Sequence, residues 1–121
     1  MDGLCYMHEW GVMHWDIKPE NILIFDQDQI KISDFGVAWT KNPERPLTGY
    51  VSTRWYRAPE IILGLEYSTK IDVWSAGLIM AELYNFGPLI SGKSAEDQLY
   101  WILAIIGAPT EESWKQGFDK L

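Results

Sequence analysis

The sequence has little cysteine and little positive charge, and each shortage excludes a class of protein. Cys5 is the single cysteine among 121 residues, so the chain cannot form an internal disulfide. We therefore expect a reducing compartment, cytoplasmic, nuclear or both, with Cys5 as a small buried residue. The 10 Lys and Arg residues are outnumbered by 17 Asp and Glu residues, which gives a formal net charge of −7. This balance argues against binding to nucleic acid and against binding to acidic membranes.

Long hydrophobic runs are also missing. The longest apolar stretch, residues 99–108, is too short to cross a bilayer, and the first residues lack the pattern of a signal peptide. We therefore expect neither secretion nor membrane insertion. What is present is 47% hydrophobic and 22% charged residues, a composition typical of a globular protein with one modest core.

The hydrophobic periodicity predicts a mainly helical chain with one β-hairpin. Residues 3–10 are expected to be the last turns of a helix that ends at Gly11. Residues 22–33 combine an apolar run, a polar turn and an alternating, half-buried strand, which predicts a hairpin. Residues 37–57 contain prolines and glycine without periodicity, so we expect an extended loop there.

The second half of the chain predicts three helices. Ser68 is a good N-cap for a helix that runs to about Asn85, and this helix is apolar on nearly all sides, so we expect it inside the core. Ser94, with Asp97 in the capping-box position, begins a second helix that Gly107 ends. Its expected buried stripe is Leu99, Ile102, Leu103 and Ile106. A last, short helix begins at Thr110.

Three polar motifs occur in a fixed order: HWDIKPEN at residues 14–21, DFG at 34–36 and APE at 58–60. A single tripeptide arises by chance, but the ordered set resembles the catalytic half of a protein kinase. The resemblance implies an α+β, mainly α fold, a fragment of the kinase C-terminal lobe. On this view residues 1–121 are a partial kinase domain. It would run from the end of helix E through helix G into the insert of one kinase group.

The residues of these motifs suit phosphoryl transfer, which needs positioning and charge neutralisation. Asp16 is the candidate base that orients a substrate hydroxyl and accepts its proton. Lys18 is expected to reach the transferred phosphate. Asn21 and Asp34 offer hard oxygen ligands for Mg²⁺, and the predicted hairpin brings them together because they lie at its two ends. ATP and Mg²⁺ are thus the implied cofactors.

Other positions take roles from the same resemblance. Thr53 matches the hydroxyl that bridges the catalytic Asp and Lys, a pattern of serine/threonine kinases. Leu23 matches the residue beneath the adenine ring, with Ile79 and Leu83 under it. For these three apolar positions a place in an ordinary core remains an equal interpretation.

Three more residues match supports of the kinase site. His14 and Phe35 correspond to two members of a stacked hydrophobic spine. Asp72 resembles the carboxylate that bonds to the backbone of the catalytic loop.

TRWYRAPE at residues 53–60 resembles the CMGC group, which contains MAP kinases and cyclin-dependent kinases. Residues 50–57 and 79–84 most resemble the male-germ-cell-associated kinase family. The resemblance implies protein substrates with Ser or Thr followed by proline. It also implies an activating kinase for the Thr48-x-Tyr50 site, where phosphorylated Tyr50 would pair with Arg54 and Arg57. An ordinary loop tyrosine is the alternative.

Two tryptophans depart from the family pattern. Trp15 and Trp39 stand where the group has arginines that bind the phosphate of the activation loop. Because an indole has one N–H and no positive charge, we expect that a phosphate on Thr48 does not order the loop. Either the two indoles hold the loop without phosphate or the changes are drift.

The nucleotide-clamping half of a kinase is not found upstream of residue 14. A glycine-rich loop, a strand lysine and a helix glutamate are missing, and Glu60 is expected to lack its arginine partner. We expect the chain alone to be inactive, to bind no Mg-ATP and to be poorly soluble. The alternatives are a piece of an enzyme, a pseudokinase-like binding module and a truncated product.

Overall fold

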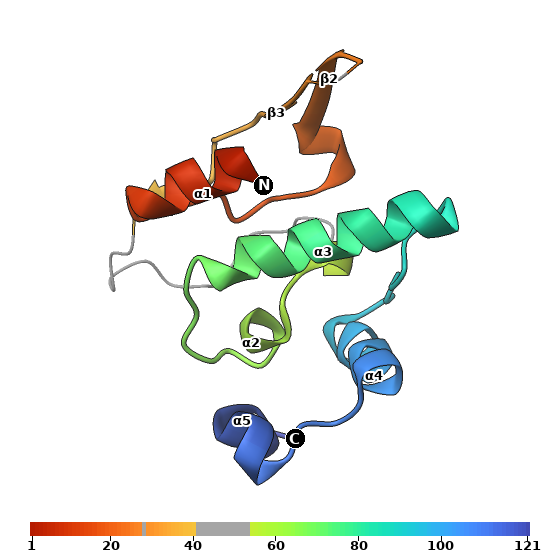
Figure 1. Ribbon diagram of the computed structural model, residues 1–121. Helices are drawn as coiled ribbons and strands as arrows, with labels where there is room; N and C mark the ends of the chain where they lie inside the picture. The colour runs from red at the N-terminus through yellow and green to blue at the C-terminus, as the bar shows by residue number, and fades with distance from the viewer. Residues whose placement is uncertain (28, 41–53) are drawn as a thin grey trace.

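A computed structural model describes residues 1–27, 29–40 and 54–121, without the side chains of residues 39 and 40. The described residues are mainly helical, as the sequence predicts, and contain two small antiparallel pairs of strands (Figure 1). In order, the elements are α1 Asp2–Glu9, β1 Val12–Met13, the 3-10 helix η1 Pro19–Asn21, β2 Ile22–Asp26, β3 Gln29–Ile32, β4 Trp39–Thr40, the 3-10 helix η2 Arg54–Tyr56, α2 Pro59–Ile62, α3 Lys70–Asn85, α4 Ala95–Ile106 and α5 Glu111–Phe118.

Helix α3 is the centre of the arrangement. In Figure 1 it runs between α1 with the β2–β3 hairpin on one side and α2, α4 and α5 on the other. No helix in the described ranges is long and apolar enough to cross a membrane.

The predicted hairpin is confirmed, but its burial is not. Strands β2 and β3 pair in antiparallel register, with Ile22 opposite Ile32. The side chains between these ends are exposed, so the prediction of a half-buried strand is wrong. The exposed apolar residues are Leu23 at 53%, Ile24 at 83%, Phe25 at 71% and Ile30 at 67%. An alternation of apolar and polar residues gives a strand one apolar face. That face is buried only if a neighbouring element covers it.

A second strand pair was not foreseen. Strand β1 pairs with β4, so that Val12 lies opposite Thr40 and Met13 opposite Trp39. Strands of two residues have no periodicity to detect, and β4 falls in the stretch predicted to be a loop. This pairing joins the residues directly before the HWDIKPEN motif to the segment that follows the DFG motif.

The main core lies where η2, α2, α3 and α4 meet. Tyr56, Leu78, Ile90 and Ile102 are buried together, and Trp74 and two isoleucines pack against them. The prediction that helix α3 lies inside the core is wrong, because only one of its faces is buried. Its buried residues are Ile71, Asp72, Ser75 and Leu78, whereas Val73, Met80, Leu83 and Tyr84 are exposed. An apolar circumference indicates that a helix can be enclosed, but the described residues bury only the face that carries Ile71, Ser75 and Leu78.

The helix ends mostly follow the predicted capping. Ser94 Oγ accepts a hydrogen bond from Asp97 N at 3.1 Å, and Gly107 ends α4 with a φ of 88°. The Asp97 carboxylate bonds to Lys93 N at 2.8 Å, in place of the reciprocal capping-box bond. Thr110 caps α5 as predicted, whereas α3 begins one residue later than expected, with Thr69 at its N-cap.

Two burial predictions are corrected by the structure. Ile102 is fully buried, Leu99 and Leu103 are half-buried, and Ile106 is 61% exposed, so the stripe on α4 is narrower than predicted. Cys5 is exposed on α1, contrary to the expectation of a buried thiol.

A buried tyrosine in the core should make the chain less stable at alkaline pH. Tyr56 is 7% exposed and its hydroxyl donates to Glu82 Oε2 at 2.6 Å. Burial, followed by the bond to Glu82, raises the pKa of Tyr56 above its ordinary value of 10.0. Since the folded state favours the protonated phenol, this stabilisation is full below pH about 10 and is lost as the pH rises through the folded pKa.

Tyr56→Phe should therefore lower the free energy of unfolding by about 1–3 kcal/mol at neutral pH, because Glu82 loses its donor. Above pH about 10 the wild-type chain should lose stability more steeply than the variant. Urea unfolding at neutral pH and across the alkaline range measures both effects. Parallel pH curves for the two proteins would contradict the assignment.

Candidate active site

One buried carboxylate holds the loop of residues 14–21, the candidate catalytic loop. Asp72, in the first turn of α3, is 1% exposed. Its Oδ2 accepts a hydrogen bond from His14 N at 2.8 Å, and its Oδ1 accepts one from Trp15 N at 2.9 Å. His8 Nε2, from α1, lies 2.9 Å from Oδ2. The prediction that Asp72 bonds to the backbone of the loop is confirmed. Two successive peptide groups are thereby fixed directly before Asp16.

Asp16, Lys18 and Asn21 form one contact cluster. Asp16 is 6% exposed and Asn21 is 5% exposed. The Asn21 amide nitrogen donates to Asp16 O at 2.8 Å and to Asp16 Oδ2 at 3.2 Å. Lys18 Nζ lies 2.8 Å from the same Oδ2. A short 3-10 helix, η1, begins at Pro19 directly after Lys18 and ends at Asn21, which returns the amide toward Asp16.

His14 connects this loop to the turn that carries Asp34. The fully buried His14 ring accepts a bond from Asp16 N at Nδ1, at 3.3 Å, so its Nε2 donates to Ser33 O at 2.9 Å. Ser33 in turn donates through its N and Oγ to Asn21 O, at 2.9 and 3.1 Å. The His14 and Phe35 rings lie 5.1 Å apart in an edge-to-face arrangement, which confirms their predicted contact.

The donor set fits a magnesium ion that is shared with phosphates. Both Asn21 N–H interactions point at Asp16, which leaves Asn21 Oδ1 as the hard oxygen of that side chain. Asp34 is exposed, and its Oδ1 accepts a bond from Gly36 N at 3.3 Å. Across the described ranges, no group of three or more His, Cys, Asp or Glu residues is placed to hold a metal. Mg²⁺ commonly takes one or two protein ligands and completes its shell with phosphates and water.

The other predicted site residues do not join the cluster of Asp16, Lys18 and Asn21 among the contacts described. Leu23 is 53% exposed and Leu83 71% exposed, so the apolar floor proposed for adenine is open in the described part of the chain. Arg54 donates through Nη1 to Lys93 O at 3.3 Å, and Arg57 is half-buried. The other sites, Thr48, Tyr50 and Thr53, lie outside the described residues, so their roles stay predictions.

Sequence reasoning missed two neighbours of the loop. His8 contacts Asp72, and Tyr67 packs against the Trp15 indole with ring centroids 4.9 Å apart. Both contacts join residues more than 50 positions apart in the chain. Neither belongs to a motif with fixed spacing, so no local signal could have indicated them.

Comparison with known proteins agrees with this geometry. The protein kinase domain family matches residues 1–118. The serine/threonine-protein kinase MAK of Rattus norvegicus is 46% identical over 120 residues, 98% of this chain and 19% of the relative. Cyclin-dependent kinase F-3 of Oryza sativa subsp. japonica is 48% identical over 120 residues, 98% of this chain and 28% of the relative. The serine/threonine-protein kinase ICK of Rattus norvegicus is 44% identical over 120 residues, again 98% of this chain and 19% of the relative.

The chain therefore belongs to the protein kinase family, whose members in general use ATP and Mg²⁺. MAK, ICK and the F-type cyclin-dependent kinase are serine/threonine kinases of the CMGC group, which confirms the resemblance that residues 50–60 carry. The chain spans between 19% and 28% of the length of these relatives.

Proposed function

We propose that this chain carries the phosphoryl-transfer residues of a serine/threonine protein kinase that acts on protein substrates. One observation carries the proposal: the buried Asp16 carboxylate contacts the Asn21 amide and the Lys18 ammonium on a loop that Asp72 anchors. A carboxylate buried with an ammonium and an amide is held in one orientation, and orientation is what phosphoryl transfer needs from a protein.

Each residue has a defined task in this proposal. Asp16 orients the substrate hydroxyl and takes its proton as the bond to phosphorus forms. Lys18, which contacts Asp16 Oδ2, is near enough to neutralise charge that develops on the transferred group. Asn21 Oδ1 and Asp34 would hold Mg²⁺, which supplies charge neutralisation at the phosphates of ATP. Thr53 would bridge Asp16 and Lys18.

The finer assignments rest on the family. We propose residues 1–121 as part of a kinase C-terminal lobe that is inactive on its own, with Leu23 as the floor for adenine. Serine or threonine followed by proline is the proposed target. An activating kinase would act on Thr48 and Tyr50, and phosphorylated Tyr50 would pair with Arg54 and Arg57.

A chimera tests the proposal directly. The 120 aligned residues of rat MAK are replaced by those of this chain, and transfer to a Ser-Pro peptide is compared with transfer to a Ser-Ala peptide. We expect an active chimera that prefers the Ser-Pro peptide. A chimera that folds and binds Mg-ATP but transfers no phosphate would contradict the proposed function.

The chain alone provides a second test. Because the floor at Leu23 is open, we expect Mg-ATP at millimolar concentration to leave its melting temperature unchanged. A clear, magnesium-dependent rise would show that the nucleotide binds without further segments, contrary to the proposal of inactivity in isolation.

The exposed hairpin supports a second candidate, a binding module without turnover. Leu23, Ile24, Phe25 and Ile30 are all exposed on the two paired strands, with Ile24 opposite Ile30, and exposed apolar side chains can mark an interaction surface. A module of this kind would bind a Ser-Pro peptide in the chimera without transferring phosphate. Fluorescence anisotropy of a labelled peptide, measured beside the transfer assay, separates the two candidates.

A further inference from the structure

The backbone at Trp15 has a conformation that residues with a Cβ atom rarely adopt. Its φ is 71°, in the left-handed region, although Trp15 is not a glycine. A Cβ disfavours this region, so the surrounding contacts must stabilise it. Trp15 directly precedes Asp16, and any relaxation of this φ would turn the peptide plane that leads into the Asp16 carboxylate.

Two contacts that hold Trp15 come from one described segment, residues 67–72. Asp72 Oδ1 binds Trp15 N at 2.9 Å, which fixes the backbone. The Tyr67 ring meets the indole edge to face, with centroids 4.9 Å apart and an interplanar angle of 87°. The buried Trp15 Nε1 has no acceptor among the described residues, so the indole acts here by packing.

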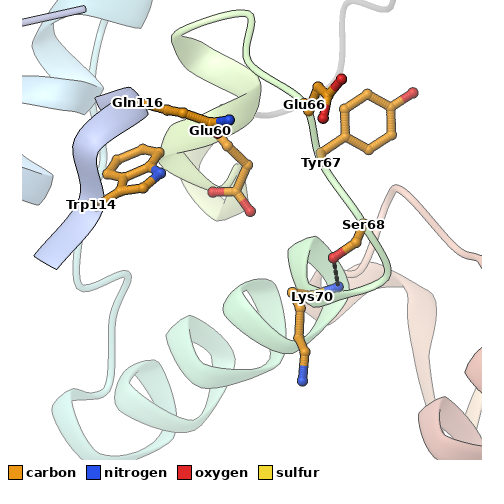
Figure 2. Close-up of a pocket in the computed structure, with 7 residues that line it drawn as sticks. All are labelled: Glu60, Glu66, Tyr67, Ser68, Lys70, Trp114 and Gln116. Carbon is orange, nitrogen blue, oxygen red and sulfur yellow. Dashed lines mark hydrogen bonds between the residues drawn. The ribbon is translucent and has the colours of Figure 1, made fainter. Parts of the chain in front are cut away.

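The segment that carries Tyr67 borders open space on its other side. A pocket of about 450 Å³ is lined by Tyr67 and Ser68 on this segment, by Glu60 on α2 and by Trp114 on α5. Figure 2 shows the Tyr67 ring pointing away from Trp114. The packing of the Tyr67 ring is directed toward the catalytic loop.

We propose that Trp15 is a positioning residue for Asp16, and that it acts through its ring contact with Tyr67. The contact keeps the left-handed peptide in place and so sets the direction of the Asp16 carboxylate. The proposal rests on the proposed function of Asp16 as the base. It explains how an uncharged indole supports the loop with no phosphate involved.

Amide hydrogen exchange of the 121-residue chain tests the contact without any need for activity. Tyr67→Leu removes the ring, whereas the matched variant Tyr67→Phe retains it. An aromatic pair is worth roughly a 2- to 10-fold change in an opening equilibrium. We expect Tyr67→Leu to speed exchange at the His14 and Trp15 amides by roughly this 2- to 10-fold factor. Tyr67→Phe should exchange at the wild-type rates. The Ile102 amide, in the core on α4, should not change.

A double variant separates the pair from general loosening. In a Trp15→Leu background, Tyr67→Leu should add no further acceleration, because the contact is already gone. The proposal is overturned if Tyr67→Leu speeds exchange at Ile102 as much as at Trp15. It is also overturned if Tyr67→Phe behaves like Tyr67→Leu.

The chimera then shows whether the contact serves the reaction. Tyr67→Leu should lower kcat by roughly the same 2- to 10-fold with the KM for ATP unchanged, and Tyr67→Phe should restore kcat. An inactive wild-type chimera contradicts the proposed function, while the exchange data still decide whether Tyr67 holds the loop. If the chimera is active and Tyr67→Leu leaves its kcat unchanged, the positioning role is overturned and the proposed function is not.

Discussion

Asp16→Asn in the chimera should lower kcat for a Ser-Pro peptide by about 100- to 10,000-fold, the range for loss of a general base. The amide has nearly the same shape as the carboxylate but cannot accept the proton of the substrate hydroxyl. It also loses the ion pair with Lys18, now 2.8 Å long. The KM for ATP should change little, since Asp16 is not proposed to bind the nucleotide.

The matched control is Asp119→Asn, which changes an exposed carboxylate at the C-cap of α5, a helix on the other side of α3 from the hairpin (Figure 1). Asp119→Asn should retain the urea midpoint of the parent chimera. Asp16→Asn loses a buried ion pair and should lower the midpoint, so its activity is compared where its urea curve shows it fully folded. If Asp16→Asn kept kcat within about threefold of the parent, Asp16 would not be the base.

Asp72→Ala should destabilise the chain by about 2–6 kcal/mol, because two N–H donors lose their acceptor at a cost of about 1–3 kcal/mol each. The change leaves His14 N and Trp15 N without their acceptor and His8 without its neighbour. Because these groups are buried or half-buried, water replaces the lost bonds incompletely. The strained φ at Trp15 would then lose a contact that holds it.

Urea unfolding measures this loss, with two comparisons. Asp72→Asn keeps one acceptor oxygen and should cost about 1–3 kcal/mol. Asp119→Ala removes an exposed carboxylate and should change stability by less than about 0.5 kcal/mol. Equal effects of Asp72→Ala and Asp119→Ala would mean that the carboxylate under the loop does not support the fold.

The motifs predicted the arrangement of the loop because their chemistry depends on short spacings. Asp16, Lys18 and Asn21 are close together in the sequence, so the single 3-10 helix at Pro19–Asn21 suffices to bring them into contact. Asp72 was predictable through the family resemblance, because its partners are backbone N–H groups and these do not depend on side-chain identity.

Burial was harder to predict than secondary structure. The apolar strand at residues 22–25 has the composition of a core strand, yet Leu23, Ile24 and Phe25 are exposed. The same holds for Leu83 and Tyr84 on α3. A sequence indicates which faces can be buried, but the elements packed against them decide the outcome. The Trp15–Tyr67 contact escaped prediction for a related reason, since it depends on how two distant segments meet.

The most direct test of the central claim is where a divalent ion lies in the chimera. Mn²⁺ with ATP is titrated into protein labelled with ¹⁵N at asparagine, and paramagnetic broadening of side-chain amides is recorded. We expect the Asn21 signal to disappear at low Mn²⁺, while the signal of Asn85, at the C-terminal end of α3, remains. Persistence of the Asn21 signal while others broaden would contradict the claim that Asn21 and Asp34 hold the metal beside Asp16.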